Sequence, residues 1–294
     1  MFLYVLLRLT VVVLAMVLIG LVVVVGTDRL RRSRRDVRRR ARAIAPAAAV
    51  LVVVLSTNSV ARRVVPDGSH IVGIRATFGV DATWWIYELE GGFLPWLQSF
   101  ETAALTAYFS FIYVYGYVFL LVFPVLAYLA LPDTRPVREL LVAYSLNYAL
   151  GLLCYLLVIA YGPRNVMPEL VDALMYDAYP RYQHLTRQVN RNTNVFPSLH
   201  TSLAVTVALV AYRTRETYPL WYPIAAVLGL SVAVSTMYLG IHWAIDVVAG
   251  AVLAAVSVAL AARLVGRFSP GELLGRFSVE GLLGRLSLRE RLER

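Results

Sequence analysis

Two short stretches place ionisable and hydroxyl side chains at the start of apolar segments. The first, "FPSLHTS", contains Ser198 and His200, and the second, "STMYLGIHWAID", contains His242 and Asp246. The i, i+4 spacing of His242 and Asp246 predicts that both side chains share one face of a helix. A carboxylate in that place can bond one ring nitrogen, which fixes the tautomer and leaves the other nitrogen free to attack or to move a proton.

Together the two stretches indicate phosphoryl transfer. One histidine can act as nucleophile, oriented by Asp246, and the other as the general acid that protonates a leaving oxygen. The free amides of a helix start, with Ser198 and nearby arginines, form a site for a phosphate. Tyr238 and Gly240 precede His242, and the glycine allows a tight turn and a close approach of backbone to ligand. Taken alone, "FPSLHTS" is equally typical of a helix N-cap.

The composition is that of an integral membrane protein. The chain has 294 residues, of which 59% are hydrophobic, and it contains several apolar runs of membrane-spanning length. Such runs must be helical, because the bilayer offers no other partner for the backbone. We therefore expect an all-α, polytopic membrane bundle with about six transmembrane helices. The single cysteine, Cys154, excludes an intrachain disulfide and a site with several cysteine ligands.

Seven apolar segments are expected, and the second is short enough that its crossing is open. They cover residues 9–25, 44–55, 103–131, 140–161, 197–212, 220–239 and 242–265. The third is longer than a bilayer requires, which predicts a tilt or a kink near Pro124. Its tyrosines (Tyr108, Tyr113, Tyr115 and Tyr117) are typical of helix packing and of an interface belt, with a lipid-lining role as the alternative.

The charge distribution predicts an orientation. All 28 basic residues are arginines, and most lie in short segments between the apolar runs, above all in residues 29–42. This is the positive-inside pattern, and it explains the net charge of +10 better than a nucleic-acid partner does. With the block at 29–42 inside, an alternating chain brings Ser198, His200 and His242 to the extracytoplasmic face of the cell membrane.

Four regions are expected along the chain. Residues 1–57 hold N-terminal membrane segments with a cytoplasmic arginine-rich loop, and residues 58–101 form an extracytoplasmic segment. This segment contains Trp84, Trp85 and Trp96, which favour the headgroup zone, so we expect it to lie on the membrane surface. Residues 102–265 form the catalytic membrane domain. Residues 266–294 contain a short repeat with arginines. We expect them to form a basic amphipathic cytoplasmic tail.

The paired motifs resemble a known family. "PSLH" followed by "YLGIHWAID" is similar to the second and third signatures of the type 2 phosphatidic acid phosphatase (PAP2) superfamily. Within it they look most like the branch of inositol phosphorylceramide synthases and related inositol phosphotransferases. The resemblance covers roughly residues 100–265. It implies a core of about six transmembrane helices, His242 as nucleophile, Asp246 as its partner, His200 as general acid, and no metal or other cofactor.

The sequence also departs from the superfamily pattern. Thr236 stands where the third signature has an arginine, and Leu199 where the second has a glycine; both changes occur in the inositol phosphotransferase branch. The first signature, which needs a lysine, is absent. Arg164 is the expected substitute for binding the substrate phosphate, beside Ser198, Tyr238 and Gly240. The rival arginines are Arg181, Arg187 and Arg191.

The expected activity is hydrolysis of a lipid phosphate or transfer of its phosphoryl-containing group to an alcohol such as inositol. Both reactions share the phosphohistidine half-reaction, so the residues leave the acceptor open. The alternatives are a relative of the vanadate-dependent haloperoxidases, which use the same fold as an oxyanion cradle, and a non-catalytic lipid-binding membrane protein. A transporter would be indicated by inverted repeats, and the sequence gives no sign of them.

Overall fold

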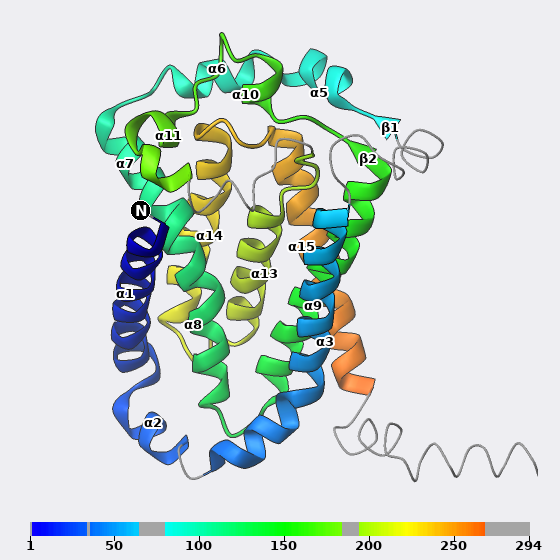
Figure 1. The fold of residues 1–294 in the computed structure, drawn as a ribbon. Helices are drawn as coiled ribbons and strands as arrows, with labels where there is room; N and C mark the ends of the chain where they lie inside the picture. The colour runs from blue at the N-terminus through cyan, green and yellow to red at the C-terminus, as the bar shows by residue number, and fades with distance from the viewer. Residues whose placement is uncertain (1, 34–35, 65–79, 184–193, 268–294) are drawn as a thin grey trace, which may run out of the picture.

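The computed structural model describes residues 2–33, 36–64, 80–183 and 194–267, which form an upright bundle of helices with a cap of short elements at one end (Figure 1). The long elements are α1 (Phe2–Gly20) with its π-helical continuation η1 (Leu21–Val25), α3 (Val37–Val64), α7 (Ala103–Phe111), η3 (Ile112–Gly116), α8 (Tyr117–Leu129), α9 (Arg135–Leu157), α13 (Leu199–Arg213), α14 (Trp221–Tyr238) and α15 (Ala244–Arg267).

The helices of the bundle alternate in direction. Figure 1 shows α1, α7 to α8, α13 and α15 running away from the cap, while α3, α9 and α14 run back toward it. Among the described residues, six helical segments are long and apolar enough to cross a membrane, and α13 is a shorter apolar helix. The prediction of an all-α, polytopic membrane bundle with about six transmembrane helices is confirmed.

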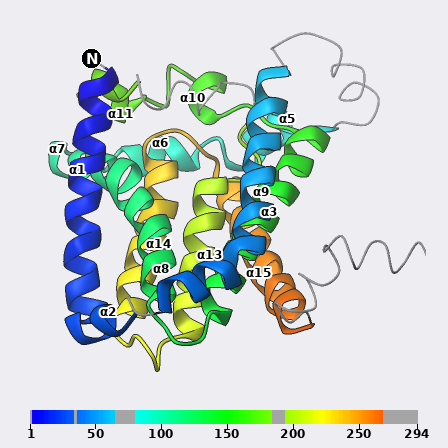
Figure 2. The same cartoon turned by 60° about the horizontal axis from the view of Figure 1, so that its bottom comes forward.

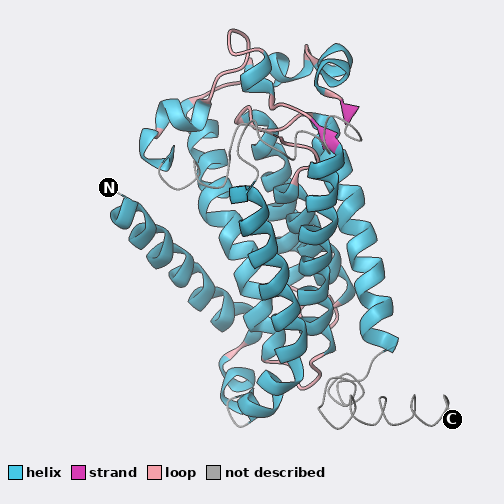
Figure 3. Cartoon of the chain, turned by 45° about the vertical axis from the view of Figure 1, so that its right-hand side comes forward, coloured by secondary structure: helices cyan, strands magenta, loops and turns pink. Residues whose placement is uncertain are grey.

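We call the capped end of the bundle the site end. It holds the short elements α5 (Thr83–Glu90), α6 (Phe93–Gln98), α10 (Pro163–Val166), α11 (Leu174–Ala178) and η4 (Pro180–Tyr182). Two short strands, β1 (Val80–Asp81) and β2 (Val158–Ile159), pair in parallel there, with Val80 opposite Val158 (Figure 3). The chain returns to this end between α3 and α7, between α9 and α13, and between α14 and α15, which brings segments distant in sequence together.

The opposite end, which we call the arginine end, carries α2 (Thr27–Ser33), the start of α3 and the turns around residues 130–134 and 214–220. Arginine side chains at this end form hydrogen bonds and ion pairs between its elements. Arg40, which is buried, donates from Nη1 to the carbonyl of Leu129 at 3.1 Å. Glu139 on α9 accepts from Arg135 at 2.7 Å and contacts Arg213 on α13 at 3.1 Å. The two ends of the bundle therefore differ in chemistry as well as in shape.

Helix α13 is the centre of the bundle, between α14 on one side and α9 and α15 on the other (Figures 1 and 2). Its buried positions include small and hydroxylated side chains, and Ser202 and Thr206 both bond the buried side chain of Asn147 on α9. Gly250 lets α15 approach the start of α13, since a Cβ there would stand 2.5 Å from the carbonyl oxygen of Ser198. Small residues at such contacts are how membrane helices pack without a hydrophobic driving force.

The boundaries differ from the expected ones in two helices. The second apolar segment is part of the long helix α3, because the charged and polar residues on either side of residues 44–55 continue the helix. It is therefore of spanning length rather than short. The third segment departs from α geometry at η3, whereas Pro124 lies inside α8. The tail repeat at 268–294 and residues 65–79 of the expected surface segment lie outside the described residues.

Candidate active site

His242 lies in the turn that joins α14 to α15, two residues before the first residue of α15. The i, i+4 spacing predicted His242 on the helix itself, but α15 begins at Ala244. The turn is held by the carbonyl of Thr236, which accepts the amides of Ile241 and His242, both at 3.0 Å. Gly240 has a φ of +69°, a left-handed conformation that side chains disfavour. The turn therefore needs a glycine at this position.

Asp246 secures both the helix start and the histidine. Its Oδ2 accepts the amide of Trp243 at 2.9 Å, which is the reach of a third-position carboxylate back to the N-cap amide in a capping box. The same Oδ2 lies 3.3 Å from Nδ1 of His242. Because a carboxylate only accepts, this contact requires a proton on Nδ1 and leaves Nε2 as the free nitrogen. The side chain of Asp246 is fully buried.

Glu90 supplies the remaining contacts to the start of α15. Its Oε2 accepts the amide of Ala244 at 2.6 Å, and its Oε1 accepts that of Ile245 at 2.8 Å. Burial raises the pKa of the Glu90 carboxyl, and the two amide hydrogen bonds act in the opposite direction. The first amides of α15 are therefore bonded to carboxylates and are not available to a phosphate.

The start of α13 holds the other motif. Ser198 is its N-cap: the buried hydroxyl accepts the amide of Thr201 at 3.3 Å and donates to the Thr201 hydroxyl at 3.0 Å. The amide of Ser198 donates to the carbonyl of Asp246 at 3.0 Å. This bond joins the two motifs directly, so that "FPSLHTS" and "IHWAID" form one unit.

His200 projects from the first turn of α13 toward η3 and the start of α8. Its ring stacks on Tyr113, with centroids 4.8 Å apart, and lies 4.6 Å from the ring of Tyr117. On another side it faces His242, at a centroid distance of 6.4 Å. Tyr113 belongs to the π-helical turn η3, and Tyr117 follows directly after it; such turns are frequent at functional sites. The two imidazoles are therefore neighbours, although they come from different helix starts.

Tyr238 and Gly240 belong to the frame around the turn. Tyr238 is buried, and its hydroxyl lies 3.1 Å from that of Thr106. Its carbonyl accepts the amide nitrogen of Gln98 at 3.0 Å, and the same Gln98 nitrogen reaches the carbonyl of Asp172. A Cβ on Gly240 would stand 2.8 Å from that Asp172 oxygen. The cap segment at 172 thus packs directly on the turn that leads to His242.

Arg164 is on α10, whose start also contacts this turn. A Cβ on Gly162 would lie 3.0 Å from the carbonyl of Ile241, and Tyr161 accepts the indole of Trp243 at 2.8 Å. The guanidinium of Arg164 lies over the ring of Tyr176 at 4.9 Å. Of the rival arginines, Arg181 lies over the ring of Tyr182 at 5.9 Å, while Arg187 and Arg191 fall outside the described residues.

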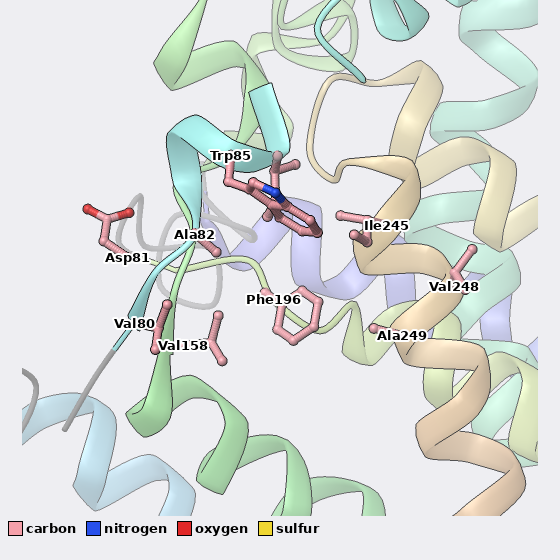
Figure 4. A pocket seen from close by; sticks show the side chains of 10 residues that line it. Val80, Asp81, Ala82, Trp85, Val158, Phe196, Ile245, Val248 and Ala249 are labelled. Carbon is pink, nitrogen blue, oxygen red and sulfur yellow. The ribbon is translucent and has the colours of Figure 1, made fainter. Parts of the chain in front are cut away.

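An apolar pocket of about 500 Å³ lies on another side of α15 (Figure 4). Trp85, Phe196, Ile245, Val248 and Ala249 are among its lining residues, and neither histidine is. It is therefore distinct from the histidine pair. Over the described ranges, no three His, Cys, Asp or Glu side chains are grouped so that they could hold a metal ion.

Glu90 and the tyrosine pair were not identified as site residues from the sequence. Glu90 is far from the motifs in the chain, in a segment that was interpreted as lying on the membrane surface, and no local pattern marks it. Tyr113 and Tyr117 were noted, but packing was the favoured interpretation. The available signal was the spacing of the two tyrosines, which are four positions apart and therefore lie on one helix face.

A model of the PAP2 superfamily matches residues 84–260, and no curated protein matched the chain. The matched region begins within α5 and ends within α15, so it contains Glu90, both histidine motifs and helices α8, α9, α13 and α14. Since the match covers more than half of the chain and contains the whole of this site, the chain belongs to the PAP2 superfamily.

Proposed function

We propose that this chain is a membrane enzyme that cleaves a lipid phosphate ester through a phosphohistidine on His242. Membership of the superfamily and the membrane-spanning helices support the general assignment to membrane phosphatases. One observation carries the finer proposal: His200 faces His242 at 6.4 Å, and Asp246 bonds His242 from behind. A nucleophile with an orienting carboxylate and a second proton-carrying group is the minimum for this chemistry.

In the first step, Nε2 of His242 attacks the phosphorus atom of the ester. The N–P bond forms, the bond from phosphorus to the leaving oxygen breaks, and protonated His200 gives its proton to that oxygen. Asp246 stabilises the positive charge that develops on the His242 ring, because its carboxylate lies on Nδ1. The products of this step are the protonated leaving group, which is an alcohol such as a diglyceride, and the phosphoryl-containing group that stays on the histidine.

In the second step, an acceptor oxygen attacks the phosphohistidine. His200, now neutral, takes the proton of the acceptor, the N–P bond breaks, and Nε2 of His242 is restored. Water as acceptor gives hydrolysis, and an alcohol gives transfer. The similarity of "FPSLHTS" and "STMYLGIHWAID" to inositol phosphotransferases favours inositol as the alcohol, and this is the finer form of the proposal.

The phosphate would be bound where the cap meets the turn. Arg164 is the proposed charged ligand, because α10 begins against Ile241 and Trp243. Ser198, whose hydroxyl is engaged in the cap, would contribute through the start of α13, and Tyr238 and Gly240 through the shape of the turn. No nucleic acid takes part, and no metal or cofactor is proposed.

The proposed location of the site is the extracytoplasmic face of the cell membrane. The arginines of α2, of the start of α3, of the start of α9, and of the end of α13 with the turn after it lie at the end of the bundle opposite to His200 and His242. Positively charged segments are retained on the cytoplasmic side during insertion. The substrate headgroup would accordingly be presented in the outer leaflet.

The experiment uses purified full-length protein in detergent with lipid phosphates labelled at phosphorus, with and without excess inositol, and mass spectrometry of the products. Label in free phosphate, insensitive to inositol, would identify a phosphatase. Label in an inositol phosphate or phosphoinositol lipid would identify a transferase. His242→Ala is the blank and should abolish turnover. Turnover that survives in this variant contradicts the phosphohistidine, and no turnover in either protein favours the non-catalytic lipid-binding alternative.

A further inference from the structure

Helix α5 has two different faces. Trp84, Trp85 and Leu89 are largely exposed, whereas Ile86 is buried against the elements below it. The last residue of the helix, Glu90, turns toward α15 and bonds the amides of Ala244 and Ile245. The outer face of the helix thus carries aromatic and apolar side chains, which favour the membrane interface. At its end, the Glu90 carboxylate holds the first turn of α15 through the amides of Ala244 and Ile245, and we call this contact the clamp.

The clamp completes the set of bonds at the start of α15. Trp243 is bonded by Asp246, and the next two amides are bonded by Glu90, so three successive donors are satisfied by two carboxylates. Each is a charge-assisted bond at the positive end of a helix dipole, the most favourable place for an anion. Burial raises the pKa of Glu90, so holding a charge there has a cost that these bonds oppose.

The geometry of the site depends on that first turn. His242 lies just before it and Asp246 within it, and their contact is already 3.3 Å long. If the two amides lost their acceptors, the turn could fray, and both side chains would move relative to each other and to His200. Displacements of about 1 Å between reacting groups can lower a rate on the order of 100-fold.

We propose that Glu90 is a positioning residue, which sets the His242–Asp246 pair by clamping the first turn of α15 from the interfacial helix α5. The inference rests on the proposed function, since it concerns the same histidine. Glu90 acts through the backbone of Ala244 and Ile245, and the reacting phosphate is not in contact with it. Its effect is therefore on the rate of the chemical step rather than on substrate affinity.

The test compares Glu90→Gln, Glu90→Ala and Glu90→Asp in the full-length protein. Glutamine keeps one acceptor oxygen but places its NH2 group, a donor, against the other helix amide. Alanine removes both acceptors. Aspartate keeps the charge on a shorter side chain. Glu88→Gln is the matched control, because it makes the same charge change on the exposed side of the same helix. The measurements are kcat and KM for a lipid phosphate, normalised to folded protein, and amide hydrogen exchange of peptides covering residues 241–250.

We expect Glu90→Gln and Glu90→Ala to lower kcat by about tenfold or more, with KM near the wild-type value. Glu90→Asp should recover part of the loss, Glu88→Gln should match wild type, and exchange in 241–250 should accelerate only in the Gln and Ala variants. Unchanged kcat in these variants, a rise in KM alone, or unchanged exchange would overturn the positioning role. Wild-type protein with no His242-dependent turnover would instead overturn the proposed function, and with it the catalytic role of Glu90.

Discussion

Asp246 bonds His242 through one carboxylate oxygen, Oδ2, while its other oxygen, Oδ1, is buried with no hydrogen-bond partner in the described part of the chain. Oδ2 also accepts the amide of Trp243, so a single atom orients the histidine and caps the helix. The consequence is that helix geometry and histidine geometry cannot vary separately. The first prediction separates charge from shape at this residue.

Asp246→Asn should preserve the fold and reduce activity strongly. The side-chain oxygen of asparagine can take the position of Oδ2. Its NH2 group can take the position of Oδ1, which has no hydrogen-bond partner among the described residues. The negative charge that stabilises a positively charged His242 ring is lost, and a change of this kind costs on the order of 10³-fold or more in rate. The measurement is single-turnover release of phosphate or of the phosphoryl-containing product, together with the thermal unfolding midpoint.

The control for this prediction is Asp246→Ala, which removes the cap as well as the charge. It should lower the unfolding midpoint, since loss of a capping bond costs on the order of 1 kcal/mol and leaves a buried amide unpaired. If Asp246→Asn retains near-wild-type turnover, the carboxylate has no electrostatic role, and its function is only to cap α15.

The second prediction concerns the tyrosines that flank His200. Tyr113 stacks on the imidazole at 4.8 Å, and an aromatic face stabilises the positive ring that a general acid needs. Tyr113→Phe keeps the ring and its stacking on His200, so it should retain more activity than a variant without the ring. Tyr113→Leu removes it and should lower kcat/KM by about 3- to 30-fold, which corresponds to the usual range of a cation–π contact.

The measurement is kcat/KM for a lipid phosphate in both variants, at equal amounts of folded protein. Tyr115→Leu serves as comparison, because Tyr115 is on the same π-helical turn but contacts the rings of Phe111 and Tyr182 rather than the histidine. Equal losses in Tyr113→Leu and Tyr115→Leu would indicate that η3 contributes only packing, and that the ring of Tyr113 has no particular role.

The sequence predicted the bundle well because hydropathy reports directly on what a bilayer accepts. Each apolar run corresponds to a helix, and the spacing of His242 and Asp246 anticipated their contact. The helix ends were less accurate. Residues 44–55 lie within a much longer helix, because backbone bonds continue through charged residues that hydropathy excludes. His242 was expected on α15 and lies before it, because two carboxylates start the helix at Ala244.

Other parts of the site could not be predicted from local patterns. Glu90 contacts α15 across a large separation in sequence, and nothing near Glu90 identifies its partner. The pairing of β1 with β2 involves two residues from each strand, too few to give a periodic signal. The bond between the Ser198 amide and the Asp246 carbonyl uses backbone atoms only, so it depends on the fold and not on residue type at those positions.

The third prediction tests the close packing of the two motifs. Gly250→Ala would bring a methyl group to 2.5 Å from the Ser198 carbonyl oxygen, which is backbone and cannot rotate away. Helices α13 and α15 must then separate, and such overpacking costs about 1–3 kcal/mol. We expect a lower thermal unfolding midpoint in detergent and a loss of activity, because the separation moves His200 relative to His242.

Gly92→Ala is the matched control, since a Cβ there meets no atom within 4 Å and the glycine has a φ of −85°. It should leave both the unfolding midpoint and the activity unchanged. If Gly250→Ala behaves like Gly92→Ala, the contact between α13 and α15 is looser than the structure describes, and the two histidines are not held together by it.

The last prediction concerns the orientation of the chain in the membrane. Cys154→Ala removes the only cysteine, and single cysteines can then be placed by Glu169→Cys at the site end and by Glu216→Cys at the arginine end, both at exposed positions. With the arginine end in the cytoplasm, a membrane-impermeant maleimide added to intact cells should label the cysteine at 169. The cysteine at 216 should be labelled only after the membrane is permeabilised. The opposite pattern would place His200 and His242 on the cytoplasmic side, so that the substrate would have to come from the inner leaflet, while equal labelling of both positions in intact cells would mean that the chain inserts in both orientations.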